Sequence, residues 1–349
     1  MAIHSAGNGG WHKFRVGSFS GGYIDACSKK CRTWSPFMVI AVLNASLRSL
    51  IESKLPPSVE PLWFEDRDHL FDLAPRAQIA WLDPIAPADA AVAIERMKAL
   101  KWYNAMSSGV DWLPLGQLRQ RGVMLTNGAG IHAQSVAEYA IMGMLTMAKG
   151  WRDVVRAQDR HEWLAEPPGR RELLDAEVLV IGAGEIGRRI AEILRVIGAR
   201  TTVARRSPGP GELGSDEWRG ALGRFDWVVV IVPSTPQTKS MIGAAEFAAM
   251  KPGAIVVNFA RGTVIEQDAL VAALDAGTLG GAFLDVTDPE PLPADHPLWS
   301  RENVHISMHL AGRAQEALYA RGAKRFLDNL DRYLMGDALE HQVDLSRGY

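Results

Sequence analysis

The chain has 349 residues, which is more than a single hydrophobic core usually supports, so two domains with a cleft between them are expected. Hydrophobic residues make up 47% of the sequence, charged residues make up 22%, and the formal net charge is -2. This balance lacks the basic field that nonspecific nucleic-acid binding requires, so we expect no nucleic-acid partner. No apolar run approaches the roughly 20 residues that span a bilayer, and no signal-peptide stretch opens the chain, which predicts a cytoplasmic protein without a membrane partner.

Residues 1–37 show neither helical nor strand periodicity, and we expect them to be a mobile tail. An alternative is that the true start is Met38. The two cysteines of the chain, Cys27 and Cys31, fall in this segment, and no further Cys or His follows at zinc-finger spacing. We therefore predict neither a disulfide framework nor a metal site.

From Met38 to about Thr126, short apolar runs alternate with helical patterns, which predicts an α/β lobe with a parallel sheet. The apolar runs lie at 38–43, 77–82, 102–106 and 123–126, and a helical pattern lies at 90–100. A long helical pattern then extends from Ser135 to Arg160, although Gly143 weakens it. Further strand-like runs at 177–181, 201–204, 227–232, 254–259 and 281–286 predict a second doubly wound parallel sheet.

The run from Val178 to Gly187 reads as a strand that enters a G-x-G-x-x-G turn, followed by a helix. In such a turn Gly182 permits a tight bend, Gly184 lets the backbone approach a pyrophosphate, and Gly187 lets the helix pack on the strand. The strand before the turn and the helix after it favour dinucleotide binding over a glycine-rich turn that binds nothing. The expected contacts of this loop are Gly182, Gly184, Glu185, Ile186 and Gly187.

The next strand ends in Arg205, Arg206 and Ser207, where an Asp or Glu would bind the adenosine ribose of NADH. Two guanidinium groups suit the 2′-phosphate of NADPH. We therefore predict that NADP(H) is preferred and that NAD(H) remains possible. The competing interpretation is that the two arginines only solvate a surface loop.

Three further segments each place a polar group after a buried strand: Arg261, Glu290 and His309. Because ligands bind beyond the carboxyl ends of strands in open α/β sheets, these side chains are expected to converge. An Arg can hold a carboxylate and polarise a ketone, a His can supply a proton, and a Glu can stabilise the imidazolium. This chemistry fits the reduction of a 2-oxo acid by a nicotinamide.

With these motifs in order, the chain resembles the D-isomer-specific 2-hydroxyacid dehydrogenase family, and most closely its glyoxylate and hydroxypyruvate reductase branch, over about 38–349. The resemblance implies NAD(P)H-dependent reduction of a small 2-oxo acid to the D-2-hydroxy acid. Arg261, Glu290 and His309 are then catalytic, with Arg261 and the backbone of Ser108 and Gly109 binding the substrate carboxylate. It also places Val232, Pro233, Thr235, Thr238, Asn258, Ala260, Arg261, Asp285 and His309 along the cofactor.

The family's architecture implies a flavodoxin-like substrate-binding domain, 38–132 plus 313–349, and a Rossmann dinucleotide-binding domain, 133–312. It also implies a homodimer formed through the cofactor lobes and the long helix. One departure is Met308, which stands where the family usually has Pro, so we expect a looser loop around His309. Among the other histidines, His132 is expected nearest the cleft.

Two other interpretations remain open. The first is a dinucleotide-sensing protein, like the family's corepressor branch, which has this fold but acts by binding a partner rather than by catalysis. A formate-dehydrogenase-like enzyme is disfavoured by Glu290, where that branch carries Gln. A phosphoglycerate-dehydrogenase-like enzyme remains possible for a chain without the extra C-terminal regulatory domain.

Overall fold

The computed structural model of the protein describes residues 38–313 and 316–347. They belong to one compact unit, Met38–Tyr349. The expected tail, 1–37, and with it Cys27 and Cys31, lies outside the described residues. In the part of the chain that is described, no helix has the length and apolar character needed to cross a membrane.

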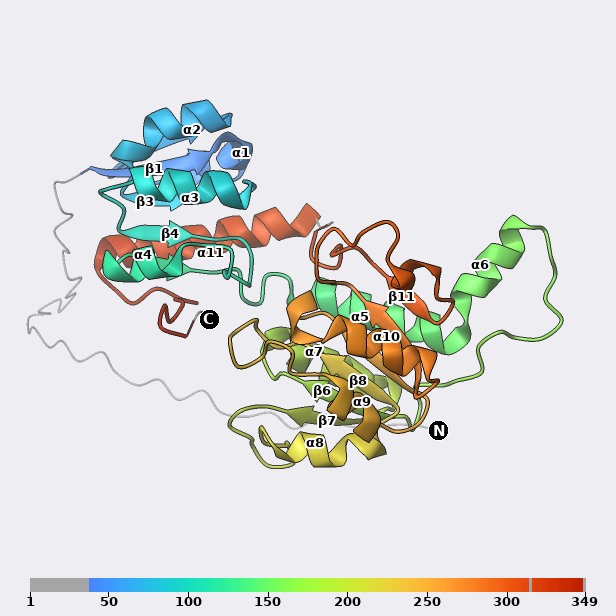
Figure 1. Ribbon diagram of the computed structural model, residues 1–349. Helices are drawn as coiled ribbons and strands as arrows, with labels where there is room; N and C mark the ends of the chain where they lie inside the picture. The colour runs from blue at the N-terminus through green and yellow to red at the C-terminus, as the bar shows by residue number, and fades with distance from the viewer. Residues whose placement is uncertain (1–37, 314–315, 348–349) are drawn as a thin grey trace, which may run out of the picture. The chain divides into compact units, whose positions relative to one another are not determined.

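The first sheet has five parallel strands in the order β2-β1-β3-β4-β5, which is the flavodoxin-like order. The strands are β1 (Val39–Asn44), β2 (Val59–Phe64), β3 (Ile79–Trp81), β4 (Trp102–Asn104) and β5 (Met124–Thr126). Its helices are α1 (Arg48–Ile51), α2 (Arg67–Leu73), α3 (Pro87–Arg96) and α4 (Leu115–Gln120). The C-terminal helix α11 (Glu316–Met335) lies beside these elements (Figure 1). It is anchored by Phe326, whose ring centroid is 5.0 Å from that of Trp81 and 5.2 Å from that of Trp102.

The second sheet has six parallel strands in the order β11-β10-β9-β8-β6-β7. The strands are β6 (Glu177–Ile181), β7 (Arg200–Ala204), β8 (Trp227–Val230), β9 (Ala254–Asn258), β10 (Leu279–Leu284) and β11 (Val304–Ile306). The helices are α5 (Ala133–Lys149), α6 (Trp151–Asp159), α7 (Glu185–Ile197), α8 (Glu217–Ala221), α9 (Ala244–Ala249) and α10 (Gln267–Asp275). Two parallel α/β sheets confirm the predicted fold class, and β6 matches the predicted strand residue for residue.

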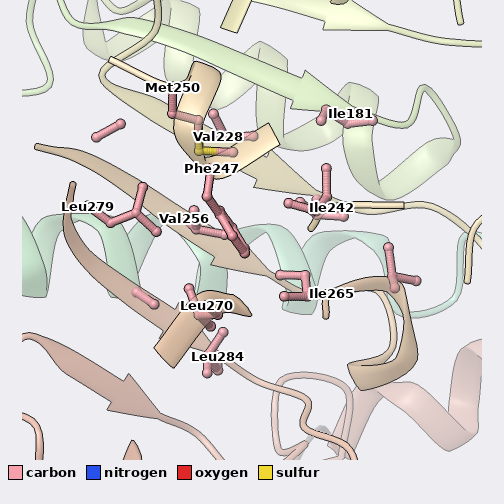
Figure 2. Packing of buried hydrophobic residues seen from close by; sticks show 14 of the residues in the cluster. Ile181, Val228, Ile242, Phe247, Met250, Val256, Ile265, Leu270, Leu279 and Leu284 are labelled. Atoms are coloured by element: carbon pink, nitrogen blue, oxygen red, sulfur yellow. The ribbon is translucent and has the colours of Figure 1, made fainter. Parts of the chain in front are cut away.

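The central strands β6, β8 and β9 of the second sheet are largely apolar because both faces of the sheet are covered by helices. On one face, side chains such as Val228, Val256 and Leu284 pack against Phe247 of α9 and Leu270 of α10 (Figure 2). The other face packs against α5 and α7. This double cover fixes the carboxyl ends of the strands, where the polar side chains described below emerge.

The strand β2 was not predicted from the sequence, because it contains Pro61. Proline lacks the N–H that a central strand must donate on one side. β2 lies at the edge of its sheet, with Ala41 of β1 as the neighbour of Pro61, so one side of the strand needs no partner. Edge position therefore explains why the strand forms.

The prediction of one continuous helix over 135–160 is wrong, because the segment forms two helices. Gly150 adopts a left-handed backbone, with φ +62°, and separates α5 from α6. A Cβ at Gly150 would lie 2.7 Å from the backbone nitrogen of Gly169, so the position also requires a residue without a side chain. Gly143 remains helical, and its bare backbone lets the ring of Phe283 approach to within 2.8 Å of where a Cβ would stand.

Candidate functional site

The glycine loop joins β6 to α7 where β6 lies between β7 and β8, the point at which the strand order reverses. Gly182 has φ +117°, which favours glycine, and a Cβ at Gly187 would overlap the carbonyl oxygen of Gly182. Gly184 faces open space, because nothing lies within 4 Å of where its Cβ would be. The loop is thus tightly closed on itself and open toward the cavity. The residues fit a dinucleotide, whose pyrophosphate would lie against Gly184 and the first turn of α7.

A cavity of about 420 Å³, here called the Arg261 cavity, adjoins this loop. Its lining includes Gly109, Gly184, Val232, Arg261 and His341. Glu185 and Ile186 of the glycine motif also line it, and the Glu185 carboxylate lies 4.0 Å from Nδ1 of His341. The sequence did not point to the C-terminal residues 341–343 at this cavity. They reach it because the segment runs beside β5, where Val343 donates its N–H to the carbonyl oxygen of Leu125.

A second cavity of about 340 Å³, the Arg205 cavity, opens at the end of β7. Arg205 and Arg206 line it as expected, and so does Arg219, which the sequence did not suggest. The guanidinium of Arg205 lies 3.7 Å from the carboxylate of Glu212. Ser207 is exposed and lies outside the lining of this cavity.

The loop after β8 forms one wall of the Arg205 cavity. Val232, Pro233, Thr235 and Thr238 all line it. The hydroxyl of Thr238 donates to the carbonyl oxygen of Pro233 at 2.6 Å and accepts from the N–H of Thr235 at 2.8 Å. These bonds shape the loop from within, so the threonines hold its backbone along the cavity.

Arg261 follows β9 in a turn that Asn258 holds. The buried amide of Asn258 donates to the carbonyl oxygen of Arg261 at 3.2 Å and accepts from the N–H of Ala260 at 3.0 Å. The guanidinium lies 3.3 Å from the carboxylate of Asp111. It also occupies the space beside Gly109 that a Cβ would need. Asn258 and Ala260 thus position Arg261 in this structure, and their contact with a cofactor stays a prediction.

The segment Ser108–Gly109 is held from three sides. Asn127 donates to the carbonyl oxygen of Ser108 at 2.7 Å, the hydroxyl of Ser108 donates to Gly128, and Trp112 donates to the carbonyl oxygen of Gly109. Among the described residues, the backbone N–H groups of Ser108 and Gly109 donate to no partner. Two free donors beside a guanidinium form a suitable site for a carboxylate.

His309 and Glu290 form a hydrogen-bonded pair, with 2.8 Å between Nδ1 and Oε2. Burial raises the pKa of the Glu290 carboxyl, but the bond and charge of His309, the N–H of Thr287 and the charge of Arg261 outweigh it, so this pKa is lowered. Glu290 therefore stays ionised near neutral pH. Its bond to Nδ1 leaves Nε2 of His309 as the ring nitrogen available to a substrate.

The loop that carries His309 is fixed by Asp285. Its carboxylate accepts the hydroxyl of Ser307 at 2.7 Å and the N–H groups of Leu310 and Ala311 at 3.0 and 3.4 Å. Burial is the main cause that raises the pKa of Asp285, against the lowering effect of these bonds and of His309. Asp285 thus lies beneath the loop in this structure, and its expected approach to the nicotinamide stays a prediction.

The backbone at Met308 and His309 is left-handed, with φ +55° and +57°. Proline, whose φ is held near -65°, cannot adopt this conformation, so the family's usual residue does not fit this backbone. Met308 thus has a backbone conformation that a proline at this position could not adopt.

His309 and Glu290 line a third cavity of about 480 Å³, the His309 cavity, together with Leu292, Trp299 and Arg313. Arg261 lines its own cavity with Ser108 and Gly109, yet its charge reaches Glu290. The structure thus forms two groups: a guanidinium beside Gly109, and a histidine hydrogen-bonded to a carboxylate. The ring nitrogens of His132 lie 3.1 and 3.0 Å from the carbonyl oxygens of Gly312 and Met106, which makes this residue a structural bridge.

Within the described ranges, no cluster of three or more His, Cys, Asp or Glu side chains could hold a metal ion. The arrangement has three chemical capacities: a glycine loop for a dinucleotide, a cationic clamp for a carboxylate, and a histidine with a carboxylate partner for proton transfer.

A model of the NAD-binding domain of D-isomer-specific 2-hydroxyacid dehydrogenases matches residues 141–311. A glyoxylate/hydroxypyruvate reductase A of Salmonella heidelberg (strain SL476) is 31% identical over 267 residues, which cover 72% of this chain and 83% of that protein. A D-isomer-specific 2-hydroxyacid dehydrogenase family protein from Aeromonas salmonicida subsp. salmonicida A449 has a similar crystal structure, with TM-score 0.79 and 27% identity over 88% of this chain and 99% of that one. The crystal structure of a D-isomer-specific 2-hydroxyacid dehydrogenase from Xanthobacter autotrophicus Py2, in complex with NADPH and MES, is also similar, with TM-score 0.73 and 26% identity. The match covers 90% of this chain and 100% of that one.

Proposed function

Because the chain belongs to the D-isomer-specific 2-hydroxyacid dehydrogenase family and is an NAD(P)-dependent oxidoreductase, we propose that it reduces a small 2-oxo acid to the D-2-hydroxy acid. The proposed substrates are of the glyoxylate and hydroxypyruvate type, and NADPH is the preferred reductant. The observation that carries the proposal is the guanidinium of Arg261 beside Gly109, where the N–H groups of Ser108 and Gly109 have no partner among the described residues. The charge of Arg261 reaches Glu290, which is hydrogen-bonded to His309.

In the proposed reaction, Arg261 and the two N–H groups bind the carboxylate of the substrate and turn its ketone toward His309. Protonated His309 gives the proton on Nε2 to the ketone oxygen as the C=O bond becomes a C–O bond. Glu290 remains negative and stabilises the imidazolium before transfer. The reduced dinucleotide, when bound, supplies the hydride that forms the new C–H bond and is itself oxidised.

The preference for NADPH is supported by the Arg205 cavity. Arg205, Arg206 and Arg219 line it, and β7 ends at Ala204 without the acid that would bind the ribose of NADH. The relative from Xanthobacter autotrophicus Py2 was solved with NADPH. Three guanidinium groups at one cavity give a 2′-phosphate the charge-assisted hydrogen bonds that it requires.

We also propose that 38–132 with 313–349 form the substrate-binding domain and 133–312 the dinucleotide-binding domain.

The chain is proposed to be a homodimer through α5, α6 and α7, which expose Met142, Leu145, Trp151, Val155 and Val196. A groove of about 490 Å³ lies on this face, and exposed apolar patches of this kind mark interaction sites. A sedimentation measurement that finds only monomer would reject the proposed dimer. A location in the cytoplasm stays a prediction.

The test is the initial rate of NADPH and NADH oxidation with glyoxylate, hydroxypyruvate, pyruvate, phenylpyruvate and branched 2-oxo acids. We expect rapid turnover with NADPH on at least one short 2-oxo acid, and a D-configured product by chiral chromatography. Dinucleotide binding without turnover on any substrate would reject the proposal in favour of a sensing protein. Equal kcat/KM with both dinucleotides would reject only the cofactor preference.

A further inference from the structure

The His309 cavity has one charged wall that the proposed reaction does not use. Arg313 follows the histidine loop, and its backbone N–H donates to the carbonyl oxygen of Leu310 at 3.0 Å, so the residue is held one turn after His309. Its exposed side chain lines the same cavity as His309 and Glu290. Arg313 therefore contributes an exposed cationic side chain to the wall of the cavity that also contains His309.

The other charged groups of this cavity already have partners. Glu290 accepts from His309, and Asp285 accepts from Ser307 and from two backbone N–H groups of the loop. In contrast, no described residue forms an ion pair or hydrogen bond with the guanidinium of Arg313. Among the charged residues of the cavity wall, Arg313 is therefore the one whose side chain can bind an anionic group of a ligand.

The rest of the wall and the size of the cavity indicate a longer ligand than glyoxylate. Leu292, Trp299, Ile306 and Met308 give the cavity an apolar side. Its volume is about 480 Å³. The carboxylate next to the ketone is proposed to lie in the Arg261 cavity, so only the rest of the ligand has to fit here. A side chain of five non-hydrogen atoms takes about 150 Å³ if each atom has the volume of a liquid water, about 30 Å³. The cavity therefore has room for a side chain that ends near Arg313.

We propose that the enzyme accepts 2-oxo acids with a second carboxylate at the far end of the side chain, and that Arg313 binds this distal carboxylate. The inference rests on the proposed function and specifies its substrate class. Arg261 binds the carboxylate next to the ketone, the apolar wall contacts the methylene groups, and Arg313 forms charge-assisted hydrogen bonds with the distal group. The products are the 2-hydroxy dicarboxylate and oxidised dinucleotide, with hydride at C2 and the proton of His309 on the oxygen.

The test compares substrates of equal chain length on the purified full-length protein: 2-oxoglutarate with 2-oxovalerate, and oxaloacetate with 2-oxobutyrate. The measured quantity is the ratio of kcat/KM for the dicarboxylate to that for the monocarboxylate. We expect a ratio above one in the unmodified enzyme. Arg313→Met should lower it on the order of 10- to 100-fold, the effect of losing a hydrogen-bonded charge pair, and Arg313→Lys should lower it less.

Arg119→Met is the matched control, because Arg119 is an exposed arginine of α4 outside the lining of the three cavities. It should leave the ratio unchanged. A ratio below one in the unmodified enzyme, or an Arg313→Met variant that loses both substrate types equally while binding dinucleotide normally, would overturn the inference. Good turnover of short monocarboxylates alone would reject this inference and keep the proposed function, whereas no turnover on any 2-oxo acid would reject the proposed function itself.

Discussion

The carboxyl group of Asp83 makes a quantitative prediction about stability. Asp83 follows β3, and its carboxylate accepts the backbone N–H of Met106 at 3.0 Å, just before the proposed substrate-binding segment Ser108–Gly109. The residue keeps partial exposure, but its carboxyl group is enclosed by protein atoms, beside the fully buried ring of Tyr103. Burial raises the pKa of Asp83 from 3.8 to about 6, although the bond from Met106 lowers it in part.

This raised pKa fixes the sign of the effect. The folded state binds the proton of Asp83 more tightly than the unfolded state, so its contribution is present below about pH 4 and is lost as the pH rises through about 6. The difference between 3.8 and about 6, at about 1.4 kcal/mol per pH unit, corresponds to about 3 kcal/mol. Asp83→Asn removes the charge and keeps an oxygen that can accept from Met106.

The free energy of unfolding by urea should be measured for both proteins at several pH values between about 3 and 8, because this range brackets both pKa values. The value for Asp83→Asn minus that for the unmodified protein should increase by about 3 kcal/mol across this range. The other carboxyl groups make the same contribution to the stability of both proteins, so their contributions cancel in the difference. Asp331→Asn, at an exposed position of α11, serves as the control and should show a much smaller change. A difference that is constant with pH, or that decreases, would refute the argument from burial.

Three further predictions concern the site. His309→Ala should lower kcat by on the order of 10² to 10⁴ while dinucleotide binding, followed by fluorescence titration, stays near normal; an unchanged kcat would reject His309 as proton donor. Replacing Arg205 and Arg206 by Ser should shift the kcat/KM ratio of NADPH to NADH toward NADH by about 10- to 100-fold, and an unaltered ratio would mean that these arginines only solvate the loop. Gly187→Ala should lower the free energy of unfolding by about 1–3 kcal/mol, because its Cβ overlaps Gly182, whereas Gly184→Ala should melt normally and bind dinucleotide weakly. Equal melting of the two alanine variants would contradict the packing that separates them.

The fold could be predicted where hydrophobic pattern and local chemistry agree. The strand 177–181 was found because an apolar run ends in a glycine turn, and β6 has the same bounds. The edge strand β2 was hidden by Pro61, because edge position depends on pairing between distant segments. The break at Gly150 was not predicted: the sequence indicated one helix over 135–160, weakened at Gly143, whereas Gly143 is helical and Gly150 has the left-handed backbone that ends α5.

The same distinction applies to the site. Arg261, Glu290 and His309 could be selected as polar residues that follow buried strands, and the structure pairs His309 with Glu290. Residues 341–343 at the Arg261 cavity could not be selected, because they reach it through pairing with β5, far away in the sequence. Asp111 lies close to Gly109 in the sequence and Arg313 lies close to His309. Only the folded chain places Asp111 against Arg261 and leaves Arg313 without a partner among the described residues.

The conformation of the histidine loop explains why Asp285 is bound so extensively beneath it. Left-handed backbone at two consecutive non-glycine residues, Met308 and His309, costs on the order of 1–3 kcal/mol each and persists only where the surroundings hold it. Asp285 provides that support through Ser307 and the N–H groups of Leu310 and Ala311. A family member with Pro before its histidine gains restraint from the ring itself. In this chain the restraint comes from a buried carboxylate, so the position of His309, the proposed proton donor, depends on a side chain that is separate in sequence from the loop it holds.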